Sequence, residues 1–312
     1  MATGALQPIA TECRTLNHRG VPFQVRMLGR AHLKDERAKR EPPRATPFNP
    51  FDPPEPGLVV GGLSPTHVCL LNKFNVVEHH LLIVTRVFEE QESWLTAADF
   101  EALALCMSGL DGLAFYNSGE AAGASQRHKH LQLIPPLGPD GLRVPMETWL
   151  SAPLARGVVK TVPDLGFGHV ATGLGPWEGV PARDGARMLE AYQSLMAAAG
   201  MGPLPLPPYN LLATRDWMLL VPRACAESQG INVNAMGFGG SLLVKTEQQR
   251  QQLEEQGPME LLRGDPARRA RVRLRPSSGC GGGRAPAGCP RAGPPASPGA
   301  GARAPSRRAR GR

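Results

Sequence analysis

Two histidines and a glutamine stand at alternate positions in the sequence HKHLQ, which spans residues 128–132. Because side chains alternate between the two faces of a β-strand, His128, His130 and Gln132 would line one face of a strand here. Two imidazoles and an amide on one face can act on an anionic ligand, although such a group is also found as an ordinary polar patch.

The segment before these residues contains several small residues, namely Gly119, Gly123, Ala124 and Ser125. Without bulky side chains, the backbone N–H groups of this segment can approach an anionic ligand closely. Pro135 and Pro136 then end the strand, because proline has no N–H to donate. A phosphate-binding loop that leads into a histidine-bearing strand predicts chemistry at phosphorus.

A zinc site is the alternative for the paired histidines, since alternating histidines can chelate this ion. Zinc would need a third or fourth ligand, and no Cys-x-x-Cys or His-x-x-x-His motif occurs in the chain. Gln132 is a poor zinc ligand. We therefore expect no metal held by protein side chains alone.

The net charge of +8 is concentrated at the carboxyl end of the chain. Of the 35 basic and 27 acidic residues, 13 arginines and one aspartate lie in residues 263–312, so residues 1–262 have a net charge of −4. The tail is rich in Gly, Pro and Ala and cannot bury enough apolar surface to offset chain entropy, so we predict that it is disordered. Its arginine-rich, lysine-free composition favours a frameshift or read-through origin, and nucleic-acid binding is the competing interpretation.

The six cysteines have no framework spacing, which favours reduced thiols in a cytoplasmic protein. The amino-terminal residues lack the apolar core of a signal peptide. No apolar run approaches the roughly 18 residues that a membrane helix needs. We therefore expect a cytoplasmic protein without a membrane segment.

Short apolar runs bounded by turn residues predict an antiparallel arrangement of strands. Apolar residues at helical spacing predict helices, and Thr96 with Asp99 has the spacing of a capping box at the start of one of them. Residues 1–45 are expected to form helix and turn, and the proline-rich residues 46–57 an extended connector. The predicted strands lie in residues 58–60, 68–71, 79–84, 113–117 and 209–223, the last range holding two strands that meet at a turn near Arg215 and Asp216. The predicted helices lie in 96–110, 184–199 and 246–262.

With these segments in place, the chain resembles the ATP adenylyltransferases, also called diadenosine tetraphosphate phosphorylases. The resemblance is carried by residues 63–91, 95–135, 208–223 and 230–245, and it includes the sequence GASQRHKHLQ. It implies an α+β fold of the histidine-triad and galactose-1-phosphate uridylyltransferase superfamily, with an antiparallel sheet flanked by helices. Residues 1–205 and 206–262 would be the N-terminal and C-terminal regions of this one fold, followed by the tail 263–312.

By this resemblance, His130 is the nucleophile that attacks the α-phosphorus of a nucleotide, and His128 orients or polarises the site. A neutral imidazole suits the role, because a backbone carbonyl can hold one ring nitrogen while the other attacks. Gln132 stands where the hydrolases of the superfamily have a third histidine. Its amide can donate a hydrogen bond but cannot move a proton at neutral pH, which favours phosphate over water as the acceptor. Arg127 departs from the pattern, which has a proline before the histidine pair.

The resemblance also implies a set of substrate-binding residues. Around the α-phosphate they are Asn117, Gly123, Ala124, Ser125 and Gln126. The others are Lys34, Asn72, Lys73, Asn210, Thr214, Met218 and Arg223. For Asn210 and Thr214, an ordinary turn is an equal alternative.

The implied activity is the reversible phosphorolysis of diadenosine tetraphosphate to ATP and ADP through a covalent AMP–histidine, with adenylyl sulfate as a second donor. Mg²⁺ is expected to accompany the nucleotide, because polyphosphate charge needs screening. The expected partners are small-molecule nucleotides and phosphate rather than membranes or nucleic acids. The alternatives are a histidine-triad hydrolase that uses water and a non-enzymatic protein that binds nucleotides or RNA.

Overall fold

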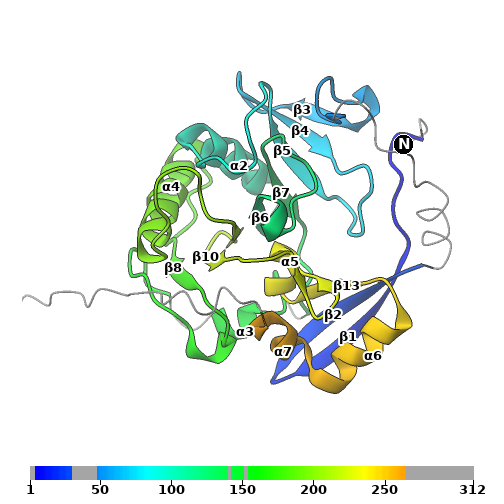
Figure 1. Cartoon of the computed structure of the whole chain (residues 1–312). Helices are drawn as coiled ribbons and strands as arrows, with labels where there is room; N and C mark the ends of the chain where they lie inside the picture. Colours follow the sequence, from blue (N-terminus) through cyan, green and yellow to red (C-terminus); the bar gives the residue numbers. More distant parts are fainter. Residues whose placement is uncertain (1–3, 30–47, 140–141, 151–153, 265–312) are drawn as a thin grey trace, which may run out of the picture. The chain divides into compact units, whose positions relative to one another are not determined.

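An eight-stranded sheet, antiparallel at every pairing, forms the centre of the protein (Figure 1). The structure is a computed structural model that describes residues 4–29, 48–139, 142–150 and 154–264. The strands, in spatial order, are β3 (Val59–Gly62), β4 (His67–Leu71), β5 (Leu81–Thr85), β7 (His130–Ile134), β6 (Leu113–Ser118), β9 (Tyr209–Ala213), β10 (Trp217–Pro222) and β8 (Val170–Gly173). This arrangement confirms the predicted antiparallel α+β fold.

Both faces of the large sheet are covered, so its central strands are buried on each side. In β6, Leu113 and Phe115 enter one hydrophobic core while Ala114 and Tyr116 enter the other. All six residues of this strand are buried. The alternation follows from the two-residue period of a strand, and it assigns every residue of β7 to one face or the other.

Two helices, α2 (Ala97–Gly109) and α4 (Pro181–Ala198), pack against each other over one face (Figure 1). The predicted capping box begins α2: the Thr96 side chain accepts from the Asp99 N–H, and the Asp99 carboxylate accepts from the Thr96 N–H. Phe100, Leu103 and Met107 of α2 are buried, as their helical spacing predicts.

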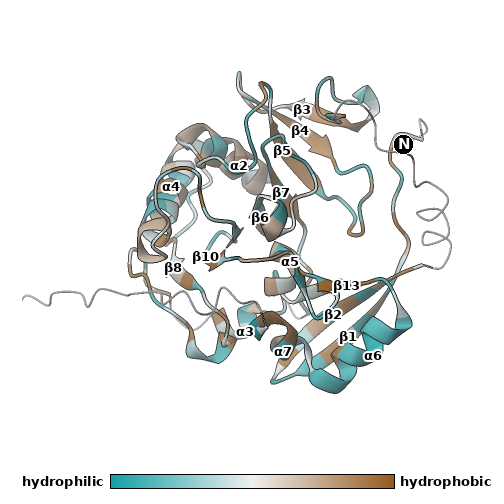
Figure 2. Ribbon diagram, in the orientation of Figure 1, coloured by the Kyte–Doolittle hydropathy of each residue, from teal (hydrophilic) through white to brown (hydrophobic). Residues whose placement is uncertain are grey.

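The other face is partly covered by a second sheet of three strands, β1 (Thr11–His18), β2 (Val21–Leu28) and β13 (Ser241–Val244). Short elements join it: β11 (Glu227–Ser228), β12 (Ile231–Asn232), α3 (Glu147–Leu150), α5 (Ala235–Phe238), α6 (Glu247–Gln256) and α7 (Pro258–Arg263). Figure 2 shows α6 as hydrophilic, in line with the single buried residue in this helix, Leu253. His130 and Gln132 of β7 lie on this face, because Leu131 and Leu133 between and beside them enter the core under α2 and α4.

The prediction of helix and turn for residues 1–45 was wrong over residues 11–28. β1 and β2 form an antiparallel hairpin, and β13 pairs with β2 in parallel. Val21, Phe23 and Val25 are buried at alternate positions, so the period of a strand was present in the sequence. The partner that covers β2 comes from the far end of the chain, which local reasoning did not consider.

The boundaries near the carboxyl end are clearer in the structure. The helix predicted for residues 246–262 is broken at Gly257, which has a φ of 86° and is followed by Pro258, the first residue of α7. The division predicted at 205/206 falls between α4 and β9, and strands from both sides of it share the large sheet. Apart from Arg263 and Gly264, the predicted disordered tail lies outside the described residues.

A buried ion pair anchors β7 to α2 on the helical side of the sheet. The Lys129 ammonium, fully buried, lies 3.0 Å from the Asp99 carboxylate and 2.8 Å from that of Glu89. It also donates to the Trp94 carbonyl at 2.9 Å. Burial by itself raises the pKa of Asp99. The hydrogen bond from His67 and the charge of Lys129 lower this pKa by more than burial raises it, so the net shift is downward.

Replacing Lys129 with alanine is expected to destabilise the protein by about 3–5 kcal/mol, because the buried Asp99 carboxylate loses its counter-ion. Arg14→Ala removes half of an exposed pair with Glu12 and is expected to cost less than about 1 kcal/mol. Urea unfolding of the two variants measures the free energies. Equal free energies of unfolding would show that the buried pair does not hold β7 to α2.

Candidate active site

His130 begins β7 and faces away from the helical layer. Its Nδ1 lies 2.8 Å from the His128 carbonyl, which can only accept, so Nδ1 carries the proton and Nε2 keeps its lone pair. Burial lowers the pKa of His130 to about 4. The ring is therefore neutral at pH 7, with an unprotonated nitrogen on the open side of the sheet.

His128 is held at both ring nitrogens. Its Nε2 donates to the Thr85 carbonyl at 2.7 Å, and its Nδ1 accepts from the Asn49 side-chain amide at 3.0 Å. Because both of its ring nitrogens are hydrogen-bonded, His128 is held in place, and its main-chain carbonyl in turn fixes the ring of His130. This geometry fits the orienting half of the role predicted for His128.

Two aromatic rings lie against the histidine pair. The Phe51 centroid is 5.3 Å from that of His130 and 5.7 Å from that of His128, and Phe88 lies 5.4 Å from His128. An apolar wall of this kind favours the neutral form of the His130 imidazole. Sequence reasoning treated the segment that carries Asn49 and Phe51 as a connector and missed both residues; the run NPF, ahead of three prolines, was the available signal.

Gln132 is oriented by a hydrogen-bonded chain that starts in the turn before β5. The Asn72 amide donates to Nδ1 of His80 at 3.1 Å, so Nε2 of His80 carries the proton and donates to Oε1 of Gln132 at 2.9 Å. Burial lowers the pKa of His80 to about 4, which matches a neutral ring. The chain leaves the amide nitrogen of Gln132 to donate toward the same space as His130. Sequence reasoning assigned no role to His80.

A second polar cluster lies beside His130, on β6 and β9. Oδ1 of Asn117 accepts from the Asn210 side chain at 2.8 Å and from the Ala235 N–H at 3.0 Å, which orients the Asn117 amide. Arg223 donates to Oδ1 of Asn210 and, at 2.9 Å, to the Val233 carbonyl. Asn117 and Asn210 therefore lie together, while Arg223 supports Asn210 from behind.

The glycine-containing loop follows Asn117 and turns back over the open end of β6. Gly119 and Gly123 have φ values of 86° and 89°, which favour glycine, and the short helix η2 (Glu120–Ala122) lies between them. A Cβ on Gly123 would come within 2.8 Å of the Cβ of Asn234, so this position also requires glycine for space. Ala124, Ser125 and Gln126 complete the loop, and the Arg127 guanidinium binds the Glu90 carboxylate at 2.5 Å.

The remaining predicted binding residues are distributed unevenly. Lys73 pairs with Glu55 at 2.6 Å next to Asn72, and Lys34 lies outside the described residues. Met218 packs in the core beneath α2 and α4, on the opposite face from His130, so its side chain cannot line this site. Thr214 accepts from the Asp216 N–H in the β9–β10 turn, at the end of β9 away from Asn210. These two placements do not support a contact with a ligand at His130.

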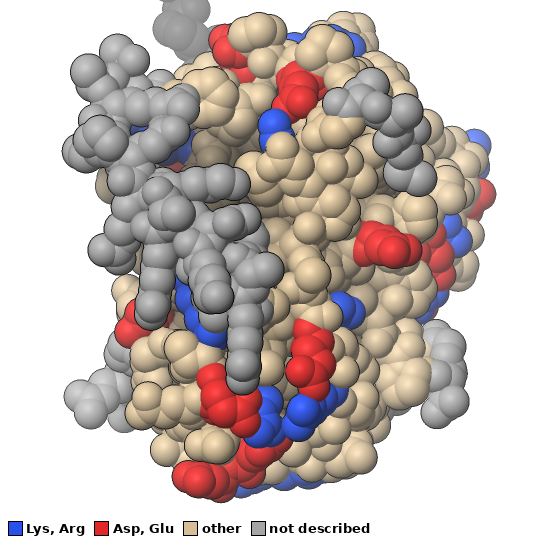
Figure 3. Space-filling view, turned by 90° about the vertical axis from the view of Figure 1, so that its right-hand side faces the viewer, with Lys and Arg blue, Asp and Glu red and all other residues tan. Residues whose placement is uncertain are grey.

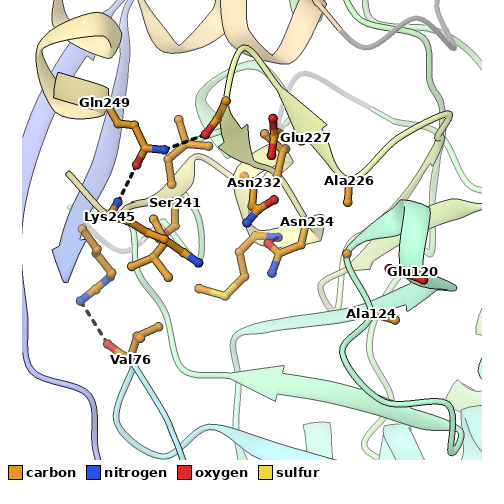
Figure 4. A pocket seen from close by; sticks show the side chains of 18 residues that line it. Val76, Glu120, Ala124, Ala226, Glu227, Asn232, Asn234, Ser241, Lys245 and Gln249 are labelled. Carbon is orange, nitrogen blue, oxygen red and sulfur yellow. Dashed lines mark hydrogen bonds between the residues drawn. The ribbon is translucent and has the colours of Figure 1, made fainter. Parts of the chain in front are cut away.

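A cavity of about 490 Å³ adjoins the loop at Gly123 and Ala124 and extends to the three-stranded sheet (Figure 4). Lys245 and Gln249 lie on one side of it, and Glu120 and Ala124 on the other. The buried hydroxyl of Ser241 and Nε of Arg26 have no hydrogen-bond partner and line this cavity. Buried polar atoms without a protein partner leave this wall able to hydrogen-bond to a polar ligand or to water. Sequence reasoning missed this wall, because β2 was expected to be helical.

The described residues also show whether the protein offers a metal-binding cluster, a membrane-spanning helix or a surface patch of one charge. Among them, no group of three or more His, Cys, Asp or Glu residues could hold a metal ion. No helix within this part of the chain is long and apolar enough to cross a membrane. On the surface drawn in Figure 3, acidic and basic side chains lie next to one another rather than in a patch of one sign.

Comparisons with known proteins identify relatives of the chain. Sequence models match residues 1–152 as the Ap4A phosphorylase N-terminal domain and residues 163–264 as the ATP adenylyltransferase C-terminal domain. The diadenosine 5',5'''-P1,P4-tetraphosphate phosphorylase 2 of Saccharomyces cerevisiae is 31% identical over 244 residues, which cover 66% of this chain and 72% of the yeast protein.

Solved structures agree with the sequence comparison. The crystal structure of yeast Ap4A phosphorylase Apa2 superposes with a TM-score of 0.68 and 25% identity, covering 84% of this chain and 89% of that one. The same yeast protein in complex with Ap4A has a TM-score of 0.68 and 26% identity, covering 84% and 91% of the two chains.

His80 and His130 are buried and neutral, and we can therefore predict how the stability of the protein depends on pH. Their pKa values are about 4 in the folded state, against about 6.5 in an unfolded chain, so the unfolded chain takes up protons first as the pH falls. The free energy of unfolding is therefore expected to fall as the pH drops from about 6.5 to about 4. Thermal melts across this range measure the slope.

His80→Asn is expected to reduce this slope, since it removes one of the two histidines with a pKa of about 4. His79→Asn alters an exposed neighbour and is expected to keep the slope of the unmodified protein. Identical slopes in both variants would contradict a neutral, buried His80.

Proposed function

Because this chain belongs to the family of the Ap4A phosphorylases, we propose that it cleaves diadenosine tetraphosphate with phosphate, giving ATP and ADP in a reversible reaction. The observation that carries the proposal is the free Nε2 of His130 beside the amide of Gln132 and the glycine-containing loop. A nucleophile, a hydrogen-bond donor and an anion-binding loop on one open face are the parts that phosphoryl-group transfer needs.

In the first step, Nε2 of His130 attacks the α-phosphorus of the dinucleotide in line with the leaving oxygen. A P–N bond forms, the bond from this phosphorus to the bridging oxygen breaks, and its electron pair leaves with ATP. The imidazole becomes positively charged in the AMP–histidine, and the His128 carbonyl that holds Nδ1–H stabilises this charge. Gln132 donates to an oxygen of the transferred phosphoryl group.

In the second step, an oxygen of inorganic phosphate attacks the same phosphorus. The P–N bond breaks, its electron pair returns to Nε2 of His130, and ADP is released. Since the Gln132 amide cannot accept a proton at neutral pH, it cannot activate water, whereas phosphate arrives as an anion that needs no base. Adenylyl sulfate is a second donor by the same steps, with sulfate as its leaving group.

The cavity beside Gly123 provides room for the nucleotide that is not transferred. Within the described residues, no acidic side chain lies within ion-pair distance of Lys245, and Ser241 offers a buried hydroxyl without a partner. A cation and a hydroxyl donor suit the phosphates and ribose of the departing ATP.

Mg²⁺ is the metal ion that we expect to be bound together with the nucleotide. Mg²⁺ would be carried by the substrate's own phosphates, since the described residues offer no cluster of ligands for it.

The four cysteines of the described residues are free, which supports a cytoplasmic location. Nucleotides and phosphate are the partners we propose.

His130→Ala is expected to lower phosphate-dependent ADP formation by about 10³-fold or more, because it removes the nitrogen that forms the bond to phosphorus. The assay follows ADP from diadenosine tetraphosphate with and without phosphate, and His79→Ala serves as the control. AMP formation without phosphate would favour a hydrolase that uses water. Full activity of His130→Ala would refute the covalent route.

Lys245→Met is expected to raise KM for diadenosine tetraphosphate roughly tenfold, since one charge-assisted hydrogen bond to the departing nucleotide is lost. With adenylyl sulfate, which has no second nucleotide, KM should not change. The ratio of the two KM values is the measurement. An equal rise for both donors would contradict the placement of the departing nucleotide in the cavity.

A further inference from the structure

The ladder between β6 and β7 ends at Gln132, two positions before the nucleophile His130. The pairs Leu113↔Ile134, Ala114↔Leu133 and Phe115↔Gln132 are in register, and continuing this register would place Asn117 opposite His130. Those two residues do not pair. The side chain of Gln91, from the segment after β5, lies between their main chains instead.

Gln91 makes the hydrogen bonds that the missing pair would have made. Its Oε1 accepts from the His130 N–H at 2.9 Å, and its Nε2 donates to the carbonyls of His130 at 3.2 Å and Asn117 at 3.0 Å. One amide thus satisfies three buried main-chain groups. The residue is buried, with only 2% of its surface exposed.

The contacts admit one orientation of this amide and one kind of side chain. Exchanging oxygen and nitrogen would set an oxygen against two carbonyls and an NH₂ against an N–H. A carboxylate could accept from His130 but could donate to neither carbonyl. Asparagine is shorter by one methylene group and cannot span the gap.

Gln91 is itself fixed by its own main chain. Its N–H donates to the Arg127 carbonyl at 2.7 Å, and its carbonyl accepts from the buried Tyr116 hydroxyl. The inserted side chain is therefore held from the loop that precedes the histidines and from β6. It joins the three segments that meet at His130.

We propose that Gln91 is a positioning residue for adenylyl transfer, holding the main chain of His130 at both its N–H and its carbonyl while separating β6 from β7. The separation lets Asn117 and the glycine-containing loop turn toward the imidazole. The proposal rests on the function proposed above. A displacement of about 1 Å at a nucleophile can cost about 10²-fold in rate, so this support acts on chemistry more than on affinity.

Gln91→Met tests the support with a side chain of similar length and no polar atoms. The rate of AMP–His130 formation in a single turnover is expected to fall by about 10- to 100-fold, with KM for diadenosine tetraphosphate within about threefold of the unmodified protein. Gln251→Met makes the same chemical change at an exposed position of α6 and should alter neither quantity. A Gln91→Met protein that is folded and adenylylated at the normal rate would overturn the proposal.

Gln91→Glu gives a second readout that also serves if Gln91→Met does not fold. Around this position lie the Tyr116 hydroxyl, the His130 imidazole, Glu90 paired with Arg127, Glu92, and the Lys129 ammonium bound to Glu89 and Asp99. Only a protonated glutamate can donate to one of the two carbonyls, so its rate relative to the unmodified protein should rise as the pH falls from 8 to 5. A constant ratio across this range would also overturn the proposal.

The two failures remain distinguishable. If the unmodified protein forms no AMP–histidine and no phosphate-dependent ADP, the proposed function is wrong. If it does both and the Gln91 variants behave like the Gln251 control, only the role of Gln91 is wrong.

Discussion

The hydrogen bond from Nδ1 of His130 to the carbonyl two residues earlier in its own chain fixes the chemistry of the site. It selects the tautomer, points Nε2 into the open space and requires only the main chain as its acceptor. Because the acceptor is a carbonyl, no second titration competes with that of the imidazole. The ring of His128, held by the Thr85 carbonyl and the Asn49 side-chain amide, keeps that carbonyl in place.

The segment that leads into β7 and β7 itself carry two kinds of polar group, and the large sheet keeps them on opposite faces. On the helical side, the Lys129 charge is neutralised by Asp99 and Glu89 within the protein. On the other face, His130 is neutral and Gln132 accepts a hydrogen bond from His80. A segment that alternates a buried cation with imidazoles is stable because each face has its own partners.

The sequence was sufficient to place the central strands and helices and to set His130 and Gln132 on one face of β7, because alternation is a local signal. The chemical roles of the two residues stay predictions. The sequence also predicted the capping box of α2 and the turn between β9 and β10. It could not reveal Gln91, His80 or Asn49, since their partners across the site lie 26 to 79 residues away and ordinary residue types carry no mark of such contacts. The resemblance implied that Met218 binds the substrate, but the alternation of side chains along β10 directs Met218 into the core.

The parallel pairing of β2 with β13 joins Gln24 to Ser241, so one wall of the cavity is built from both ends of the folded body. During synthesis the hairpin of β1 and β2 is made first and must wait for almost all of the remaining chain before its partner emerges from the ribosome. Contacts of such long range form late in folding. A nascent chain therefore contains its histidine strand well before the cavity wall formed by β2 and β13 is complete.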